Sequence, residues 1–298
     1  MAQLRSHYFM IIILNRFGQL GNQLMLFSKF ITLALEENLE IMNPAFADYA
    51  GSFEYFAQNR LATIPEKDSF WTKKAARAGL AHGAMRAVAF IAEKLPFLMR
   101  RVEVLRAGSG KKFNLADPHF VEKSRGKTLI FLEGWPRLQV NYKGKYADRL
   151  REFFRPHRMH QQAISAMEKE GRKLGDVLVG IHVRQGDYQN WESGKYFFSS
   201  EQYAGIMTNV ENLFPGERVS FFIASDEAQT KKTFAQHSAI FGGESAIEDM
   251  YTLAACDYIV GPPSTFSAWA SFYGRTPRYK LKDIESPITI EDFYTPEA

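Results

Sequence analysis

Short runs of hydrophobic residues in the second half of the chain predict buried strands. Val177–Val183 reads Val-Leu-Val-Gly-Ile-His-Val, and Val219–Ala224 and Tyr258–Val260 have the same apolar character. Uninterrupted runs of this length, rich in β-branched side chains, are typical of strands buried on both faces of a parallel sheet. Helical patterns separate them, so we expect three parallel strands whose carboxyl ends meet at one edge of one sheet.

The first half begins with the same alternation of strand and helix. Phe9–Leu14 is predicted to be a buried strand, and Asn15–Gln23 a loop that contains two glycines. A helix should follow to about Glu37, because its apolar residues recur three and four positions apart. Thr128–Leu132 is predicted to be another strand. Strand, loop and helix in this order begin a βαβ unit, so the whole pattern indicates an α/β protein.

A basic segment, residues 71–101, is predicted to form one amphipathic helix. Its basic residues surround an expected core-facing stripe of Leu80, Val88, Ile91 and Leu95. Helices of this kind bind anionic membrane surfaces, but the same pattern is also typical of a solvated face above a packed stripe. Peripheral membrane contact through this helix is therefore one hypothesis, and a solvated face is the other.

Composition narrows the class of protein. The chain has 298 residues, 46% of them hydrophobic, enough for one large core or two of about 150 residues each. The formal charge of +4 permits an anionic ligand, and no basic run interleaved with aromatic residues indicates a nucleic-acid groove. Cys256 is the only cysteine, which excludes an intrachain disulfide and favours a reducing compartment. The N-terminal apolar run is shorter than the roughly 20 residues of a membrane span, so we expect a cytoplasmic protein.

Polar groups follow each of the three predicted strands. His182 and Arg184 end the first strand, Asp226 follows the second, and Ser264 follows the third. Ligands of open α/β sheets bind in the crevice at the carboxyl ends of the strands. A surface ion pair and ordinary helix capping would each explain one of these groups, but their convergence at one edge predicts a binding site.

The chemistry of these groups is that of a nucleotide site. Ser264 is a natural N-cap, and the hydroxyls of Thr265 and Ser267 add donors to the free N–H groups of a helix N-terminus, which favours a phosphate. Arg184 can fork onto the same anion in a charge-assisted hydrogen bond worth roughly 1.5–3 kcal/mol. Asp226 can accept hydrogen bonds from the N1–H and the exocyclic amine of guanine, an edge that uracil lacks. His182 can pack on the same base or bond to it.

The sequence also indicates the class of reaction. It contains no Asp-x-Asp, the arrangement by which many nucleotide-sugar enzymes hold a divalent ion, and the His157 and His160 pair has no third ligand nearby. The charge that develops on a departing diphosphate would then be met by a cation and oriented dipoles, which Arg184 and the Ser264 helix can supply. This favours metal-independent glycosyl transfer, with no cofactor other than the donor itself.

Seven motifs together resemble a known family. They are similar, in order, to those of the bacterial α-1,2-fucosyltransferases of glycosyltransferase family 11, and they run from near the N-terminus to about Gly274. The motifs are Gly18-Gln-Leu-Gly-Asn-Gln23, Glu133-Gly-Trp, Leu150-Arg-Glu-Phe-Phe154, His182-Val-Arg-Gln-Gly-Asp-Tyr188, Ala224-Ser-Asp226, Asp249-Met-Tyr-Thr-Leu-Ala-Ala-Cys256 and Ser264-Thr-Phe-Ser267.

The resemblance implies a fold and an activity. The fold would be GT-B-like, with two Rossmann-like α/β domains facing across a cleft: an acceptor-side domain over residues 1–165 and a GDP-sugar donor domain over residues 166–298. The activity would be inverting transfer of L-fucose from GDP-β-L-fucose, without a metal, to a glycan hydroxyl, such as the 2-hydroxyl of galactose. Such an enzyme would build a bacterial-type surface glycan in the cytoplasm, resting on the inner membrane if the basic helix binds lipid.

The resemblance also implies roles for individual residues. Arg184 would hold the β-phosphate, and His182 and Asp226 the guanine. The remaining donor-binding residues would be Ser264, Thr265, Phe266 and Ser267 at the diphosphate, and Gly18, Gly21, Asn22 and Gln23, whose loop would face the fucose and the acceptor. Two positions depart from the family pattern: Gln185 stands where a second arginine is usual, and Pro263 where an asparagine is usual.

The general base has two candidates. Glu192 lies ten residues after His182, the position to which the related α-1,6 enzymes assign a catalytic glutamate. Asp187 also follows the central strand, but it is better suited to orient Arg184. An inverting transfer needs such a group within reach of the acceptor hydroxyl. The structural alternative for Glu192 is a solvated loop residue.

Two other functions stay open. An α-1,6 or other GDP-sugar transferase would use the same crevice for a different donor or linkage. A nucleotide-binding protein that has lost transfer would keep only the crevice, and Gln185 is the one hint of it. Slow release of the sugar from the donor to water would separate both transferases from the second alternative.

Overall fold

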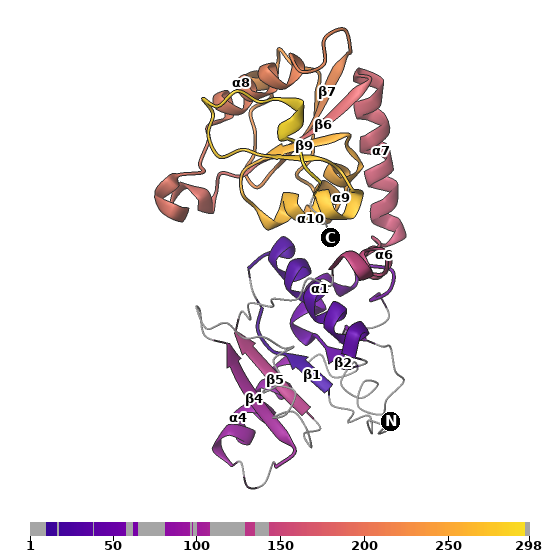
Figure 1. The fold of residues 1–298 in the computed structure, drawn as a ribbon, viewed down its shortest axis with the longest axis vertical. Coiled ribbons are helices and arrows are strands. Elements are labelled where there is room, and N and C mark those ends of the chain that lie inside the picture. Colours follow the sequence, from indigo (N-terminus) through magenta and orange to yellow (C-terminus); the bar gives the residue numbers. More distant parts are fainter. Residues whose placement is uncertain are drawn as a thin grey trace. The chain divides into compact units, whose positions relative to one another are not determined.

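The computed structural model describes residues 10–16, 18–37, 39–57, 62–64, 81–95, 97, 100–107, 129–134 and 143–295 (Figure 1). The chain divides into two compact α/β units, unit 1 over Met1–Arg155 and unit 2 over Pro156–Glu297. The predicted boundary at residue 165 falls inside α7 (Arg158–Leu174). This helix packs on α9, β7 and β8 of unit 2, so the boundary precedes it.

Unit 1 is built on a five-stranded sheet in the order β3-β2-β1-β5-β4. All neighbouring strands are parallel except β3, which pairs with β2 in the antiparallel sense. The predicted N-terminal strand is confirmed in the described part of the chain, and Thr128–Leu132 corresponds to the β5 strand. The strands are β1 (Met10–Ile13), β2 (Glu40–Met42), β3 (Thr63–Ile64), β4 (Val102–Ala107) and β5 (Leu129–Gly134).

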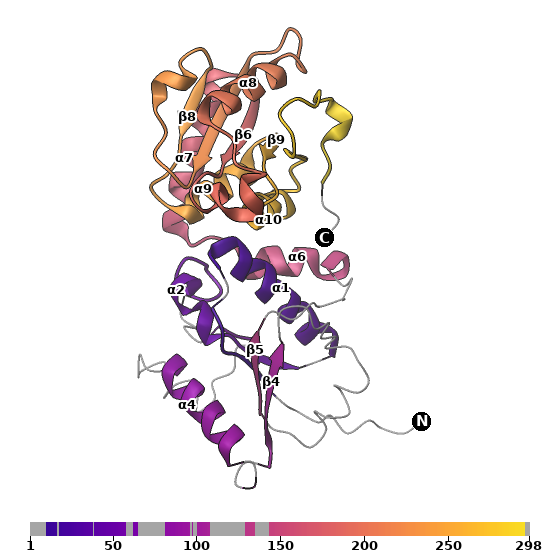
Figure 2. The ribbon, with the colours of Figure 1, turned by 90° about the vertical axis from the view of Figure 1, so that its left-hand side faces the viewer.

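Helices cover both faces of this sheet, which lies between α1 (Leu20–Glu37) and α4 (Ala81–Lys94) in Figure 2. The predicted apolar stripe of α1 is buried at Leu24, Phe27, Ile31 and Ala34. Phe27 packs against other fully buried rings of unit 1, and α1 also packs on α6 (Lys143–Phe153), where Lys145 Nζ lies 2.7 Å from Glu36 Oε2. Phe27 contacts Phe46, Phe56 and Phe154, and Phe53 packs on Phe46 and Phe154.

The basic helix is shorter than predicted, and its buried stripe is different. Helix α4 ends at Lys94 because Pro96 cannot donate a backbone hydrogen bond, and Val102 already begins β4. Ala89 and Ala92 face the core, whereas Ile91 and Leu95 of the predicted stripe are 42% and 38% exposed. The predicted residues 71–80 lie outside the described part of the chain.

Unit 2 is built on an entirely parallel sheet in the order β10-β9-β6-β7-β8. The three predicted strands are confirmed as β6 (Val177–Val183), β7 (Val219–Ser225) and β9 (Tyr258–Gly261), with β6 in the centre. The edge strands β8 (Ala239–Phe241) and β10 (Arg278–Lys280) were not predicted, since neither carries a buried apolar run.

Helices also cover both faces of the unit 2 sheet. The face toward α8 (Ser200–Glu211) carries Val179, Ile181 and Phe221 in one core cluster. The other face meets α7 and α9 (Ala246–Ala255), and Figure 1 shows α8 and α7 on opposite sides of the strands. Helix α10 (Thr265–Gly274) follows β9 directly and ends as predicted at Gly274. In the described residues, no helix is long and apolar enough to cross a membrane.

Candidate functional site

Three loops of unit 2 meet at the carboxyl edge of its sheet, as predicted. His182 and Val183, at the end of β6, pair with Ala224 and Ser225 at the end of β7, and Ile181 pairs with Val260 of β9. This register brings the loops that carry Arg184, Asp226 and Ser264 to one edge. The described cavity nearest to them lies at the ends of β7 and β8, has a volume of about 430 Å³, and is lined by Ser225, Asp226, Glu227, Gln229 and Lys231, among others.

Arg184 is held by two carboxylates. Its Nη2 lies 2.7 Å from Asp187 Oδ1 and its Nη1 lies 3.3 Å from Asp226 Oδ2, and the side chain is only 16% exposed. The guanidinium also lies over the ring of Tyr188, 5.7 Å from its centroid. This contact is the one that an orienting role of Asp187 would need, and that role stays a prediction. Two negative charges therefore surround one positive charge at this point.

Asp226 also organises the loop that follows β6. Its Oδ1 accepts a hydrogen bond from the backbone N–H of Gln185 at 2.8 Å, and its Oδ2 accepts one from Gly186 at 3.1 Å. A Cβ atom at Gly186 would come within 2.8 Å of the same Oδ2, which explains the glycine. The side chain of Gln185 has a different partner, because its Nε2 donates a hydrogen bond to Phe198 O at 3.0 Å. Asp226 thus holds the loop after β6 in place. The contact with guanine that the sequence predicted for Asp226 stays a prediction.

His182 is a buried, neutral imidazole. Burial, with the positive charges of Arg184 and Arg278, lowers its pKa to about 3. The ring stacks on Phe266, with centroids 5.0 Å apart, and its Nδ1 has no hydrogen-bond partner. Gly261 makes room for it, since a Cβ there would lie 2.8 Å from His182 Cβ. Only 3% of His182 is exposed, so its predicted packing on a base also stays a prediction.

The third loop forms the N-terminus of α10. Ser264 caps this helix, because its Oγ accepts a hydrogen bond from the backbone N–H of Phe266 at 3.2 Å. Ser267, predicted to bind the diphosphate, is fully buried and its hydroxyl accepts a hydrogen bond from Arg278 instead. The N-terminus of α10 is therefore capped by Ser264 as expected, but the buried Ser267 bonds to Arg278 and is not exposed at the helix N-terminus.

Arg278 is the functional candidate that the sequence did not reveal. It is 4% exposed, and its Nη1 donates to Ser264 O at 3.2 Å and to Ser267 Oγ at 3.1 Å. Its Nη2 donates to the Tyr294 hydroxyl at 3.1 Å, and its Nε has no partner. Among the residues that the structure describes, no carboxylate pairs with it. A buried cation without a counter-charge is costly, which makes Arg278 a candidate for contact with an anionic ligand.

The predicted base, Glu192, lies in a strained segment between β6 and α8. Its φ is 47° and that of Ser193 is 59°, a left-handed conformation that costs non-glycine residues roughly 1–2 kcal/mol each. Such strain is often found at functional sites. Glu192 is exposed to solvent, which fits either of the two roles considered for it.

The glycine-bearing loop of unit 1 is shorter than predicted. Helix α1 begins at Leu20, so Gly21, Asn22 and Gln23 form its first turn. Gly18 has the left-handed φ of 56°, and its carbonyl accepts a hydrogen bond from Gln23 Nε2 at 3.3 Å. These residues place backbone N–H groups at a helix N-terminus, and their predicted contact with the donor stays a prediction.

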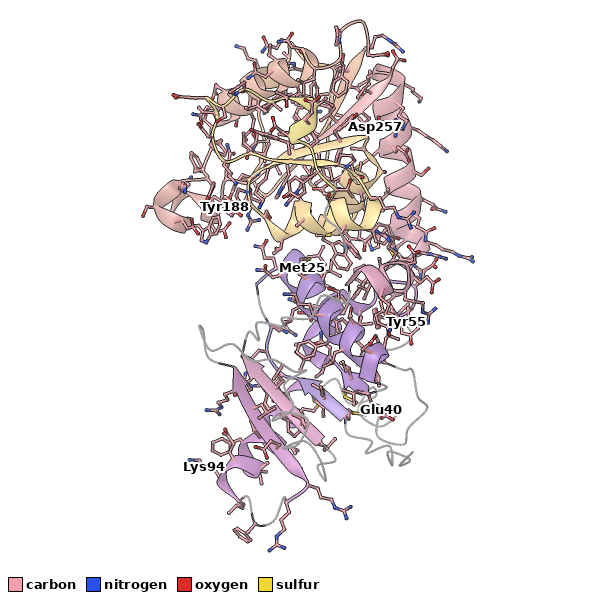
Figure 3. The ribbon with its side chains drawn as sticks, viewed as in Figure 1. Met25, Glu40, Tyr55, Lys94, Tyr188 and Asp257 are labelled. Atoms are coloured by element: carbon pink, nitrogen blue, oxygen red, sulfur yellow. The ribbon has the colours of Figure 1, made fainter. Side chains whose placement is uncertain are left out.

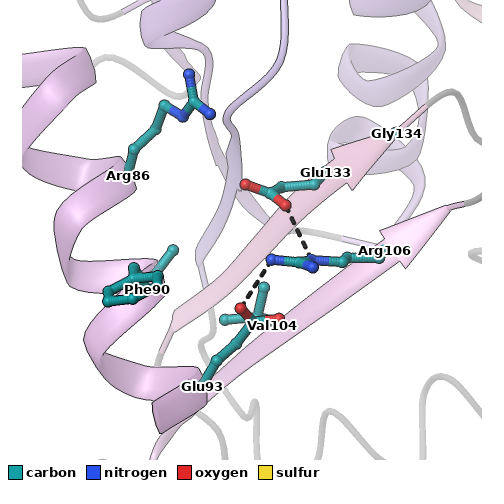
Figure 4. A pocket seen from close by; sticks show the side chains of 8 residues that line it. Arg86, Phe90, Glu93, Val104, Arg106, Glu133 and Gly134 are labelled. Carbon is teal, nitrogen blue, oxygen red and sulfur yellow. Dashed lines mark hydrogen bonds and ion pairs between the residues drawn. The ribbon is translucent and has the colours of Figure 1, made fainter.

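Unit 1 has a pocket of its own at the ends of β4 and β5 (Figure 4). It has a volume of about 410 Å³, and Arg106 bridges two carboxylates inside it. Arg106 Nε lies 3.0 Å from Glu133 Oε2, and its Nη2 lies 2.8 Å from Glu93 Oε2. The arginine is 63% exposed, so water shares these interactions.

The chain matches one family model over more than half its length. The model of glycosyl transferase family 11 matches residues 125–282. No curated protein matches the chain. The match covers all of the unit 2 strands and the loops at their carboxyl ends.

The fold is shared with solved structures of other proteins. A mutant of Arabidopsis thaliana FUT1 in complex with GDP has a TM-score of 0.58 at 13% identity, over 96% of this chain and 74% of that one. POFUT1 without ligand has a TM-score of 0.52 at 12% identity, over 95% and 100% of the two chains. The α-1,6-fucosyltransferase NodZ, crystallised with GDP, has a TM-score of 0.52 at 16% identity, over 91% and 94%. These likenesses confirm a GT-B-like α/β fold.

Proposed function

Because the chain belongs to glycosyl transferase family 11 and is a fucosyltransferase, we propose that it transfers L-fucose from GDP-β-L-fucose to the 2-hydroxyl of a galactose residue. The transfer is inverting and needs no metal ion. Two of the structurally similar proteins were crystallised with GDP, which supports this nucleotide as the product that leaves.

The observation that carries the proposal is the uncompensated positive charge at the start of α10. The buried guanidinium of Arg278 lies against the carbonyl of Ser264 and the hydroxyl of Ser267, directly below the helix N-terminus. The helix dipole adds positive potential at the same place. The diphosphate of the donor supplies the missing counter-charge, with Arg184 as the second cation.

Arg184 is primed for this task by its neighbours. Asp187 and Asp226 hold its guanidinium in a fixed position, so little side-chain entropy is lost when the diphosphate binds. The diphosphate then shares the guanidinium with these carboxylates. The guanine of the donor lies further along the crevice, where the cavity beside Asp226 has room for it.

The residues of this site can assist each part of the transfer step. The bond between C1 of fucose and the oxygen of the β-phosphate breaks, and its electron pair leaves with GDP. A bond forms between C1 and the acceptor oxygen on the opposite face of the sugar, while the hydroxyl proton passes to the carboxylate of Glu192. The charge on the departing phosphate is stabilised by Arg184 and by the N-terminus of α10, which Arg278 supports.

The exposed face of α4 supports peripheral contact with an anionic membrane. Phe90 and Ile91 of α4 are 60% and 42% exposed, Leu95 directly after the helix is 38% exposed, and Arg86 and Lys94 lie on the same helix. Figure 3 shows Lys94 at the outer end of α4. Apolar side chains that insert below basic ones are the pattern of a helix in a membrane interface. Co-sedimentation with phosphatidylglycerol vesicles should be lost in Phe90→Ser, and binding that survives this change would exclude this helix as the contact.

A transfer assay tests the function. Purified protein, GDP-fucose and lactose are incubated in the presence of a chelator, and the product is analysed by NMR. The proposal expects an α-linked fucose on the 2-hydroxyl of galactose. Fucose on another hydroxyl would overturn the linkage, and release of free fucose to water without any transfer to lactose would overturn galactose as the acceptor.

A further inference from the structure

The segment after β6 carries an aromatic cluster that the proposed reaction has not yet used. Residues 187–194 form a short coil, with 3₁₀ turns over Asp187–Gln189 and Trp191–Gly194, that projects from the body of unit 2 (Figure 1). Trp191, near the middle of this coil, is 39% exposed. The exposed part of the indole is a flat apolar area that a ligand can contact.

The tryptophan is held in place by other rings. Its centroid lies 4.7 Å from that of Tyr188 and 5.4 Å from that of Tyr196. Tyr188 is buried, and its hydroxyl donates a hydrogen bond to the carbonyl of Pro263. Figure 3 shows Tyr188 where the coil joins the body of unit 2. Trp191 thus packs against two neighbouring rings while part of its indole stays exposed.

The same cluster is connected to the donor loops. Arg184 lies over the ring of Tyr188, and Pro263 immediately precedes the N-cap of α10. The residue after Trp191 is Glu192, the proposed base, and the strained φ angles of Glu192 and Ser193 fix how the chain leaves the tryptophan. One continuous set of contacts therefore joins Arg184 to the aromatic surface, and the proposed base directly follows Trp191 in the sequence.

From this arrangement we propose that Trp191 and Tyr196 bind a sugar ring of the acceptor, an inference that rests on the proposed function. The apolar C–H face of a pyranose packs well on an exposed aromatic ring, because the ring offers a flat apolar area at low cost in side-chain entropy. Exposed polar groups lie beside the rings in sequence, on Asp187, Asn190 and Glu192, and can bond the sugar hydroxyls. A ring seated on Trp191 brings its hydroxyl toward Glu192.

A set of kinetic measurements tests this role. Wild type, Trp191→Ala and Trp191→Phe are assayed with GDP-fucose on oligosaccharides that end in galactose, glucose, mannose or N-acetylglucosamine. Loss of the indole should raise the KM for the sugar that wild type fucosylates by about tenfold or more, since truncated tryptophans at binding surfaces commonly cost that much. Trp191→Phe should recover most of the loss, and the affinity for GDP should not change in either variant.

A matched control is available in the same unit. Ile290 is also 39% exposed but lies outside the cluster, so Ile290→Ala should leave the acceptor KM unchanged. If Trp191→Ala does not fold, Tyr196→Leu tests the same surface from its other ring. Hydrolysis of GDP-fucose in the absence of acceptor should proceed at the wild-type rate in Ile290→Ala, because Ile290 lies outside the aromatic cluster.

The outcomes separate this inference from the proposed function. A wild type that neither transfers nor hydrolyses GDP-fucose would overturn the function itself. A wild type that hydrolyses the donor but fucosylates none of the sugars would overturn the proposed acceptor, and with it the sugar-binding surface. An unchanged acceptor KM in both Trp191→Ala and Tyr196→Leu would overturn the sugar-binding surface alone, and so would a loss of GDP affinity as large as the rise in acceptor KM.

Discussion

Each unit of this protein places an arginine between two carboxylates at the end of a parallel strand. Arg106 follows this pattern in unit 1, with Glu93 and Glu133, and Arg184 in unit 2, with Asp187 and Asp226. The side chain of Arg106 is 63% exposed and that of Arg184 is 16% exposed. Solvent-exposed ion pairs contribute little to folding stability, whereas Arg184 lies at a sheet edge that is partly shielded from solvent.

The larger difference lies in what surrounds the two arginines. Near Arg184 the structure contains groups that are buried and incompletely paired, the Nδ1 of His182 and the Nε of Arg278. The described residues around Arg106 leave no such buried atom without a partner. Similar ion pairs can therefore occur at two sheet edges. Unit 1 also has a buried atom without a partner, Asn43 Oδ1 just after β2, so the two arginines differ in their immediate surroundings, and the unpaired groups beside Arg184 favour a ligand there.

The largest expected effect follows from removing Arg184. In Arg184→Ala, Asp187 and Asp226 lose their shared cation and face the diphosphate directly. We expect GDP affinity to fall by about a hundredfold or more, because a charge-assisted bond is lost and repulsion is added. Calorimetric titration measures this. An affinity within threefold of wild type would contradict the assignment of Arg184 to the diphosphate.

The buried histidine gives a pH dependence of stability. The pKa of His182 is lowered to about 3 in the folded protein, so the unfolded chain binds the extra proton first as pH falls. The folding stability that depends on a neutral His182 is fully present above about pH 6.5. It is lost as pH falls toward the pKa of His182 in the folded protein. Relative to His182→Phe, wild type should lose roughly 2–3 kcal/mol of unfolding free energy between pH 7 and pH 4.5. Parallel urea curves for the two proteins would contradict this burial.

A smaller effect is expected from a substitution that removes the planar guanidinium of Arg278 but keeps its positive charge. Arg278→Lys should weaken GDP binding by about tenfold and GMP binding much less, because the β-phosphate loses its support. Arg218→Lys is the matched control, since Arg218 is 65% exposed and pairs with Asp176 before β7 begins. An equal loss for GDP and GMP would indicate a purely structural role for Arg278.

The smallest effect is expected in unit 1. Arg106→Ala removes an exposed double ion pair, which should change the unfolding free energy by less than about 1 kcal/mol. GDP affinity should stay within twofold of wild type. A large loss of GDP affinity in this variant would remove the distinction between the two sheet edges.

Much of this contrast could be read from the sequence, but not all of it. The strands β6, β7 and β9 were predicted because each is a continuous apolar run, and the parallel register then placed Arg184, Asp226 and Ser264 together. The limits of α4 were predicted too far toward the C-terminus, because the periodic pattern outweighed the break at Pro96.

The role of Arg278 could not be predicted, for a physical reason. Its segment, Arg-Tyr-Lys, resembles a solvated surface strand. It becomes buried because β10 pairs with β9 and because Arg278 also pairs with Tyr294, contacts between segments that local sequence patterns do not reveal. The burial of Ser267 follows from the same packing, which turns a predicted ligand contact into a support for Arg278.

The most direct test of the central claim is a calorimetric titration of the purified protein with GDP and with UDP in the presence of a chelator. The account predicts micromolar binding of GDP that survives the chelator, no measurable binding of UDP, and loss of GDP binding in Arg184→Ala. Absence of GDP binding, or binding that returns only with a divalent ion, would contradict a metal-independent GDP-sugar site at the carboxyl edge of the unit 2 sheet.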